Sequence, residues 1–159
     1  NALRALGSGR TRAGKELQAS ASRALHKEHE DLARTLDRLR EIADALDEAP
    51  SEKAASLIRE AQTLVARDIA DHERADEAIV YPKIALLMRD RYGLSAMSRA
   101  HREIIHLSRM LDRLCEGLTA ENTDRYAIRD AQRVIEAVEA LVRLHNAQEE
   151  DIYDHLAAG

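Results

Sequence analysis

Ionisable residues interrupt an apolar helix face near the middle of this chain. Between positions 57 and 79, residues that recur every three or four positions would share one face, namely Leu57, Ala61, Leu64, Asp68, His72, Asp76 and Ile79. An α-helix turns about 100° per residue, so His72 and Asp76 project from that face one turn apart. Burying an unpaired carboxylate costs several kcal/mol. The fold must therefore give the inward His72–Asp76 pair a proton, a partner charge or a metal ion.

The same helical periodicity recurs along the chain and predicts four amphipathic helices. They would cover residues 15–47, 50–90, 95–116 and a last stretch from about 122 to the end. The expected boundary signals are Pro50 in the first turn of the second helix, a Tyr92-Gly93 turn, a Gly117 cap, and Asn122 or Thr123 capping the last helix. Pro82 should kink or break the second helix.

Short connections between such helices predict an all-α, up-down-up-down four-helix bundle. We expect one domain, residues 15–159, preceded by a flexible N-terminal arm of residues 1–14 that contains Gly7, Gly9 and Gly14. The sequence has no Phe and no Trp, so aliphatic side chains must form the core. Helix packing suits such a core better than a β-sandwich does.

Charge and hydropathy exclude several classes of partner. The net charge of −5 gives no basic field for nucleic acid. No apolar run approaches the roughly 20 residues that span a bilayer, and no signal-peptide pattern opens the chain. The single cysteine, Cys115, lies on an apolar helix face and is expected to be a small core residue. These features favour a cytoplasmic protein without nucleic-acid or membrane partners.

The chain also repeats itself. The pattern His72-x-x-x-Asp76 returns in the last helix as His145-x-x-x-Glu149. The first and third helices echo each other too, because His26-Lys27-Glu28 matches His101-Arg102-Glu103. Two similar helical hairpins would bring one lone histidine and one histidine–carboxylate pair each to a shared centre.

A metal centre explains this pattern better than ordinary core polarity does. One histidine on an apolar face is usually a satisfied core residue, but here every helix carries one and two helices add a carboxylate. Imidazole and carboxylate ligands without thiolate suit iron, manganese or zinc, and a carboxylate can bridge two ions. The alternative is a polar bundle core held by histidine–carboxylate hydrogen bonds.

These residues resemble the hemerythrin-like, or HHE cation-binding, family in both order and spacing. The motifs that carry the resemblance are His29, His72-Glu73-x-x-Asp76, His101 and His145-x-x-x-Glu149. The resemblance implies a four-helix bundle with two non-haem iron ions (Fe2+/Fe3+) joined by an oxo or hydroxo bridge. It makes Asp76 and Glu149 bridging carboxylates and the four histidines terminal ligands.

The resemblance also implies a function, which is the binding of dioxygen or a related small molecule at the iron pair. Two alternatives stay open: an enzyme that decomposes peroxide or reduces nitric oxide at the same metals, and a sensor of iron or oxygen. The redox or signalling partner is not identified by the sequence.

The chain departs from the oxygen-carrying pattern at two positions. Those proteins have a second histidine four residues after the first in the third helix, where this chain has Ile105. His106 would lie about 140° from His101 around the helix and cannot replace it. In some relatives the glutamate directly after the second-helix histidine is a metal ligand, so Glu73 is a candidate ligand. An exposed Glu73 without a role in binding is an equally good interpretation of the sequence. Asp76 stands where the family more often has Glu.

The ligand on the first helix has two candidates. The family pattern of leucines selects His29, whereas the internal repeat pairs His26 with His101. We expect His29, with His26 as a partner of a ligand or a surface residue. The predicted metal ligands are thus His29, His72, Glu73, Asp76, His101, His145 and Glu149.

Other polar residues near the motifs have competing interpretations. Asp68 would accept a ligand imidazole N–H or pair with an arginine. Tyr81 should project opposite His72, and neither it nor Tyr153 is assigned a role. Glu77 and Glu150 are expected to be solvated. His155 is expected at the surface.

Overall fold

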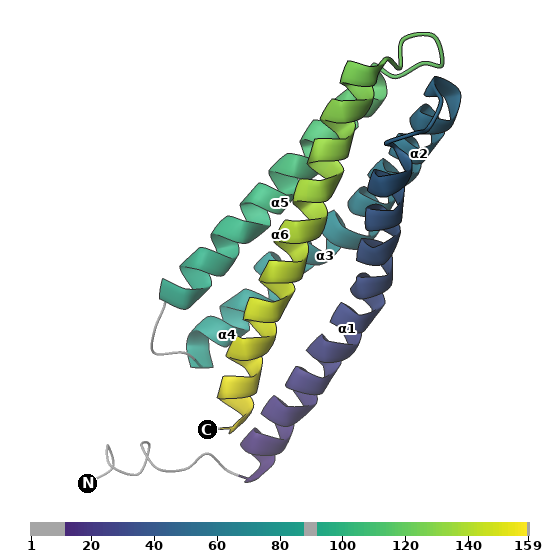
Figure 1. The fold of residues 1–159 in the computed structure, drawn as a ribbon. Helices are drawn as coiled ribbons and strands as arrows, with labels where there is room; N and C mark the ends of the chain where they lie inside the picture. Colours follow the sequence, from purple (N-terminus) through teal and green to yellow (C-terminus); the bar gives the residue numbers. More distant parts are fainter. Residues whose placement is uncertain (1–11, 88–91, 159) are drawn as a thin grey trace, which may run out of the picture.

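The structure is a computed structural model that describes residues 12–87 and 92–158 (Figure 1). The described residues form four helical stretches and contain no strand, which confirms the all-α prediction. The stretches are α1 (Arg12–Ala45), a continuous second stretch, α5 (Tyr92–Glu116) and α6 (Arg125–Ala158). The second stretch consists of α2 (Ser51–Leu64), η1 (Val65–Ala70), α3 (Asp71–Ala75), η2 (Asp76–Val80) and α4 (Tyr81–Leu87). The segments η1 and η2 are π-helical.

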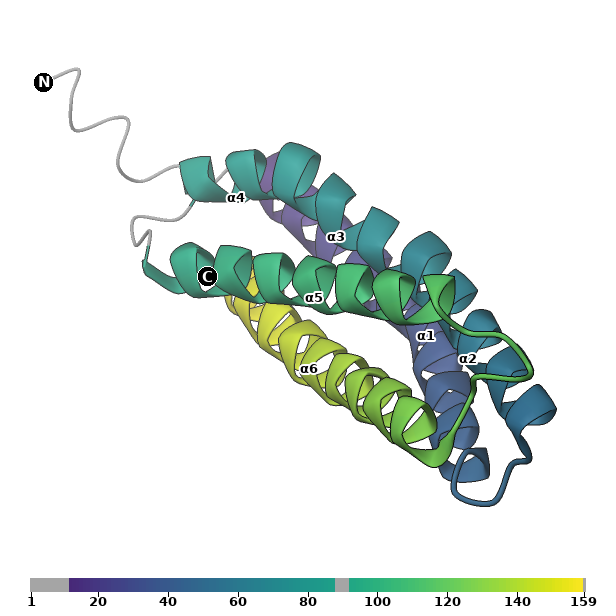
Figure 2. The ribbon, with the colours of Figure 1, turned by 90° about the horizontal axis from the view of Figure 1, so that it is seen from above.

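The helices α1 and α6 run antiparallel. Residue numbers that rise along α1 are paired with residue numbers that fall along α6. The ion pairs are His26 with Asp154, Asp37 with Arg143 and Arg40 with Glu139. Figure 2 shows α5 lying between α6 on one side and the α2–α4 stretch on the other. All four stretches therefore share one interior. Along the described parts of the chain, no helix combines the length and apolarity that crossing a membrane requires.

Aliphatic side chains fill that interior, as the absence of Phe and Trp requires. The largest fully buried hydrophobic residues come from every stretch: Leu36, Leu39, Ile42, Leu46, Ile58, Ile69, Ile104, Leu111, Ile128 and Ile135. Leucine and isoleucine favour interdigitation between helices, and each fully buried side chain stabilises the fold by about 1.5–3 kcal/mol relative to an exposed one.

Several helix boundaries differ from those predicted. Residues 12–14 belong to α1, although we assigned them to the N-terminal arm, and residues 1–11 lie outside the described part of the chain. The Tyr92-Gly93 turn is wrong, because α5 begins at Tyr92. Side-chain hydrogen bonds decide the start of α6. Asp124 Oδ1 accepts from the Ala127 N–H at 2.8 Å and caps the helix, whereas Asn122 bonds within the preceding loop.

The two prolines and Gly117 bound helices in different ways. Pro50 directly precedes α2 as its N-cap residue, one position before the expected first turn. Pro82 lies in the first turn of α4. Because proline lacks an N–H, the helical hydrogen-bond ladder is interrupted before it, and this is where the π-helical segment η2 lies. Gly117 follows α5 without a positive φ, so the left-handed form of helix cap is not used there.

The π-helical segment η2 rotates the end of the second stretch. A π turn holds about one residue more than an α turn, so residues after it turn back by about 100° relative to a continuous α-helix. The predicted inward stripe is therefore wrong at Ile79, which is 57% exposed. Glu73, Asp76 and Tyr81 form the buried face instead.

Truncation of a core leucine should measure how much the aliphatic interior contributes. Leu39 in α1 is 0% exposed, so Leu39→Ala leaves a cavity and should lower the free energy of unfolding by about 2–5 kcal/mol in urea titrations. Leu144→Ala is the matched control, because Leu144 in α6 is 58% exposed and its loss should change stability by less than about 0.5 kcal/mol. Equal losses for the two variants would contradict this assignment of the core.

Candidate metal centre

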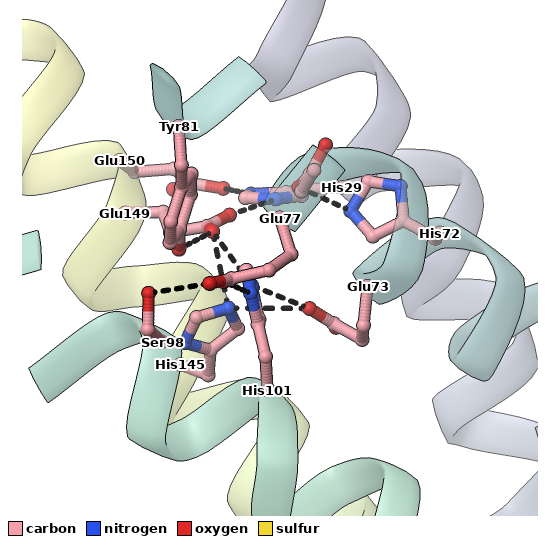
Figure 3. A network of polar contacts seen from close by, with 11 residues as sticks. His29, His72, Glu73, Glu77, Tyr81, Ser98, His101, His145, Glu149 and Glu150 are labelled. Carbon is pink, nitrogen blue, oxygen red and sulfur yellow. Dashed lines mark hydrogen bonds and ion pairs between the residues drawn. The ribbon is translucent and has the colours of Figure 1, made fainter. Parts of the chain in front are cut away.

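The structure gathers all seven predicted ligand residues at one place inside the bundle, and all of them except Asp76 are labelled in Figure 3. His29 comes from α1, His72 and Glu73 from α3, Asp76 from η2, His101 from α5, and His145 and Glu149 from α6. Six of them are buried, and the side chain of His72 is 15% exposed. Every helical stretch thus contributes at least one side chain to this cluster in the interior.

Six of the seven side chains form two groups of three, and the seventh, Asp76, lies within reach of both. The first group is Glu73, His101 and His145, and the second is His29, His72 and Glu149. Within each group, one nitrogen or oxygen of every member lies within 4.8 Å of the others. Asp76 and Glu149 form a third such set with His101, and Asp76 Oδ2 is also 3.1 Å from His72 Nε2. The carboxylates of Asp76 and Glu149 therefore lie where both groups can reach them.

The two oxygens of Glu149 face different groups. Oε1 lies 3.0 Å from His145 Nε2 and 3.5 Å from His101 Nε2, both in the first group. Oε2 lies 3.2 Å from His29 Nε2 in the second group. A carboxylate turned in this way can share its two oxygens between two cations.

The inward atoms of the cluster lack conventional hydrogen bonds. Among the described residues, no partner of acceptable geometry exists for Nε2 of any of the four histidines, for either oxygen of Glu73, for Asp76 Oδ2 or for Glu149 Oε2. Buried polar atoms are almost always hydrogen-bonded, and each exception costs about 1–3 kcal/mol. Converging nitrogen and oxygen atoms without conventional hydrogen bonds are what a cation requires, so the donor set fits a metal.

The electrostatics of the cluster also call for a cation. Burial alone would raise the pKa of Glu149, but the imidazoles of His101, His145 and His29 outweigh it and hold that pKa well below its usual range. Burial alone would lower the pKa of His101, yet the carboxylates of Glu149, Glu73 and Glu77 raise it to about 10. Protonated imidazoles thus balance the buried carboxylates, and a bound metal would take over that balance by displacing the protons.

Two glutamates that we expected to be solvated support the imidazoles from outside. Glu77 Oε2 accepts from His101 Nδ1 at 2.8 Å, and Glu150 Oε1 accepts from His29 Nδ1 at 2.8 Å (Figure 3). Such bonds fix the proton on Nδ1 and turn Nε2 towards the centre. The internal repeat could have indicated both glutamates, because Glu77 directly follows Asp76 in the sequence and Glu150 directly follows Glu149.

Tyr81 was also missed by the sequence analysis. Its ring is buried, its hydroxyl donates a short hydrogen bond to Glu149 Oε1, and it stacks on His101 with ring centroids 4.6 Å apart. A regular α-helix would turn Tyr81 away from His72, and the π-helical segment η2 brings it back. The only indication in the sequence was the adjacent Pro82, which signals an irregular helix at this point.

The structure separates the competing histidines. His29 lies inside the cluster, whereas His26 is partly exposed and pairs with Asp154 at 3.0 Å. His106 and His155 are exposed, as expected. The exposed alternative for Glu73 is wrong, because Glu73 is 0% exposed and its Oε2 lies 2.9 Å from His101 Nε2.

Asp68 and Cys115 have structural roles and do not belong to the polar cluster. Asp68 pairs with Arg67 at 2.6 Å and accepts from Thr35 at 2.9 Å, so the arginine-paired alternative is confirmed. Cys115 is partly buried against the core, and burial raises the pKa of its thiol to about 11. A protonated thiol of this kind is a poor metal ligand.

Comparison with known proteins identifies the family. Searches of curated proteins and of solved structures found no match. The family model described as the Hemerythrin HHE cation binding domain matches residues 20–156, a span that includes all seven clustered residues. The chain therefore belongs to the hemerythrin HHE cation-binding family.

Proposed function

We propose that the protein holds a pair of non-haem iron ions, with an oxo or hydroxo bridge, and binds dioxygen or a related small molecule there. The observation that carries this proposal is the position of Asp76 and Glu149, two buried carboxylates within reach of both groups of donors. A single ion would leave one group unused. When bound, the iron pair would supply electrons to the small molecule from its ferrous (Fe2+) state and become ferric (Fe3+).

Each group would hold one ion. Glu73, His101 and His145 would bind the first, and His29 and His72 the second, with Asp76 and Glu149 shared between them. Imidazole and carboxylate donors also suit manganese or zinc. Membership of the HHE family supports a cation, and the paired arrangement supports two, with iron as the ion that gives the pair its redox function.

The second group offers the better approach for a small molecule. It has fewer donors of its own, once the shared carboxylates are set aside, and His72 is the most exposed of the four imidazoles. Burial of the remaining donors excludes water from the rest of the centre.

A second candidate function is an enzyme that acts on peroxide or nitric oxide. Two observations favour it: Glu73 replaces an imidazole in the first group, and the phenol of Tyr81 places an O–H beside Glu149. Reduction of peroxide consumes protons, and a buried O–H close to the centre could relay them.

The proposal extends to the whole domain. We propose that residues 15–159 form one up-down-up-down bundle, supported by the antiparallel ion pairs between α1 and α6. The free thiol of Cys115 supports a reducing compartment such as the cytoplasm.

Iron analysis tests the paired centre directly. Protein reconstituted with ferrous iron under anaerobic conditions should contain about two iron ions per chain, measured by plasma mass spectrometry. Asp76→Ala removes a shared carboxylate and should abolish the paired centre. His106→Ala should leave the iron content unchanged, because His106 is exposed on α5. Wild-type protein without iron, or loss of iron in His106→Ala alone, would refute the proposed centre.

The glutamates behind the imidazoles should control metal affinity. Glu77→Ala removes the acceptor of His101 Nδ1 and should weaken iron binding about 10- to 100-fold in competition with a chelator. Glu103→Ala is the matched control on the neighbouring helix, since Glu103 is exposed. An affinity of Glu77→Ala equal to that of the control would show that His101 does not need this partner.

Optical spectra should separate the two candidate functions. A carrier should develop an absorption band when oxygen is added to the ferrous protein and lose it when oxygen is removed. An enzyme should instead consume added peroxide over many turnovers, as measured by an oxygen electrode or a peroxide assay. Reversible binding without turnover supports the first proposal, and turnover without a reversible band supports the second.

A further inference from the structure

We propose that Tyr81 is a positioning residue that makes the two metal sites unequal by hydrogen-bonding to one oxygen of Glu149. This inference rests on the proposed function, because it concerns the same centre. It goes further by assigning a role to a residue outside the set of candidate ligands.

The hydrogen bond of Tyr81 acts on one side of the centre. Its hydroxyl donates to Glu149 Oε1, the oxygen that faces His145 and His101 in the first group. The other oxygen, Oε2, faces His29 in the second group. A bond from an O–H to a carboxylate is charge-assisted and strong, so Tyr81 both fixes the rotation of Glu149 and engages the lone pairs of Oε1 alone.

The backbone places Tyr81 in this position. Measured around the helix from His72, Asp76 lies at about 40° and Glu73 at about 100°. A continuous α-helix would put Tyr81 at about 180°, but the extra residue of η2 turns it back to about 80°, between Asp76 and Glu73. Stacking on His101, with an interplanar angle of 30°, then holds the ring in place.

Among the described residues, no hydroxyl group donates a hydrogen bond to Oδ2 of the other shared carboxylate, Asp76. Asp76 Oδ2 makes no hydrogen bond with any residue in the described ranges 12–87 and 92–158. Tyr153 packs against the apolar cluster that includes Tyr81, but no hydrogen bond joins it to either shared carboxylate among the described residues. The phenol of Tyr81 therefore distinguishes Glu149 from Asp76, and the first group from the second.

This difference has an electronic consequence. A hydrogen bond to a ligand oxygen withdraws electron density that the oxygen would otherwise donate to the metal. The ion on the side of Oε1 should therefore favour the ferrous state more than it would without Tyr81. Removing the O–H should lower the reduction potential of the pair while leaving the ligands in place.

Tyr81→Phe tests this inference, because it keeps the ring that stacks on His101 and removes only the hydroxyl. In the iron-loaded protein we expect about two iron ions per chain, as in the wild type, and a reduction potential shifted to lower values in spectroelectrochemical titrations. Mössbauer spectra should show the two iron sites becoming more alike. Tyr126→Phe is the matched control, because Tyr126 on α6 is 83% exposed, and it should leave both measurements unchanged.

A second variant covers the case in which Tyr81→Phe folds poorly. Replacing Tyr81 by 3-fluorotyrosine keeps the shape and makes the phenol a stronger donor, so the potential should shift to higher values. Opposite shifts in the two variants support the inference. Loss of iron from Tyr81→Phe, with helix content retained in circular dichroism, contradicts it, because the phenol would then be needed for iron binding itself and not only for the difference between the two sites.

Other outcomes overturn the inference and separate it from the proposed function. A wild-type protein that loads two iron ions, with potentials unchanged in both Tyr81 variants, refutes the role of Tyr81 and leaves the iron pair standing. A phenolate-to-iron absorption band that Tyr81→Phe abolishes shows that Tyr81 is itself a ligand, and so refutes a positioning role. Wild-type protein that binds no iron pair refutes both.

Discussion

The burial of Glu73, Asp76 and Glu149 inside an aliphatic bundle is the constraint on which the rest of the structure depends. Moving a carboxylate from water into the protein interior costs several kcal/mol unless cationic or proton-donating groups surround it. Here the compensating groups are four imidazoles, one from each helical stretch. The four helical stretches must therefore place these side chains at the same level along the bundle. The distances between the helices there are limited by the lengths of the histidine and carboxylate side chains.

The two halves of the bundle differ in the kind of contact that holds the helices together. Away from the metal centre, Leu39, Ile42, Ile58 and other aliphatic residues form a continuous core, flanked by ion pairs such as those of Glu139 with Arg40 and Arg143. Around the centre the stabilising contacts are mostly polar and link different helices. The aliphatic core includes none of the seven candidate ligands, so its packing does not depend on them.

Much of the centre could be predicted from helical periodicity, because His101, His145 and Glu149 lie on regular α-helices. The end of the second helical stretch, from Ile79 to Tyr81, could not, since the sequence pattern assumes a constant 3.6 residues per turn and the π-helical segment η2 changes it. Ile79 was placed inside and Tyr81 outside for that reason. Glu77 and Glu150 were missed because the sequence analysis expected solvent-exposed glutamates to have no part in the centre. Both are partly exposed, yet each accepts a hydrogen bond from a buried imidazole.

The π-helical segment η2 makes the position of Tyr81 depend on the type of helix that precedes it. A regular α-helix over the same number of residues would leave His72, Glu73 and Asp76 where they are and swing Tyr81 by about 100° to the far side of the helix. A deletion of one residue in this segment would offset the lost π turn and keep the tyrosine on the inward face. Two members of this family with identical ligand motifs therefore need not have identical centres, and the helix type and length between the motif and the following proline would be the place to see the difference.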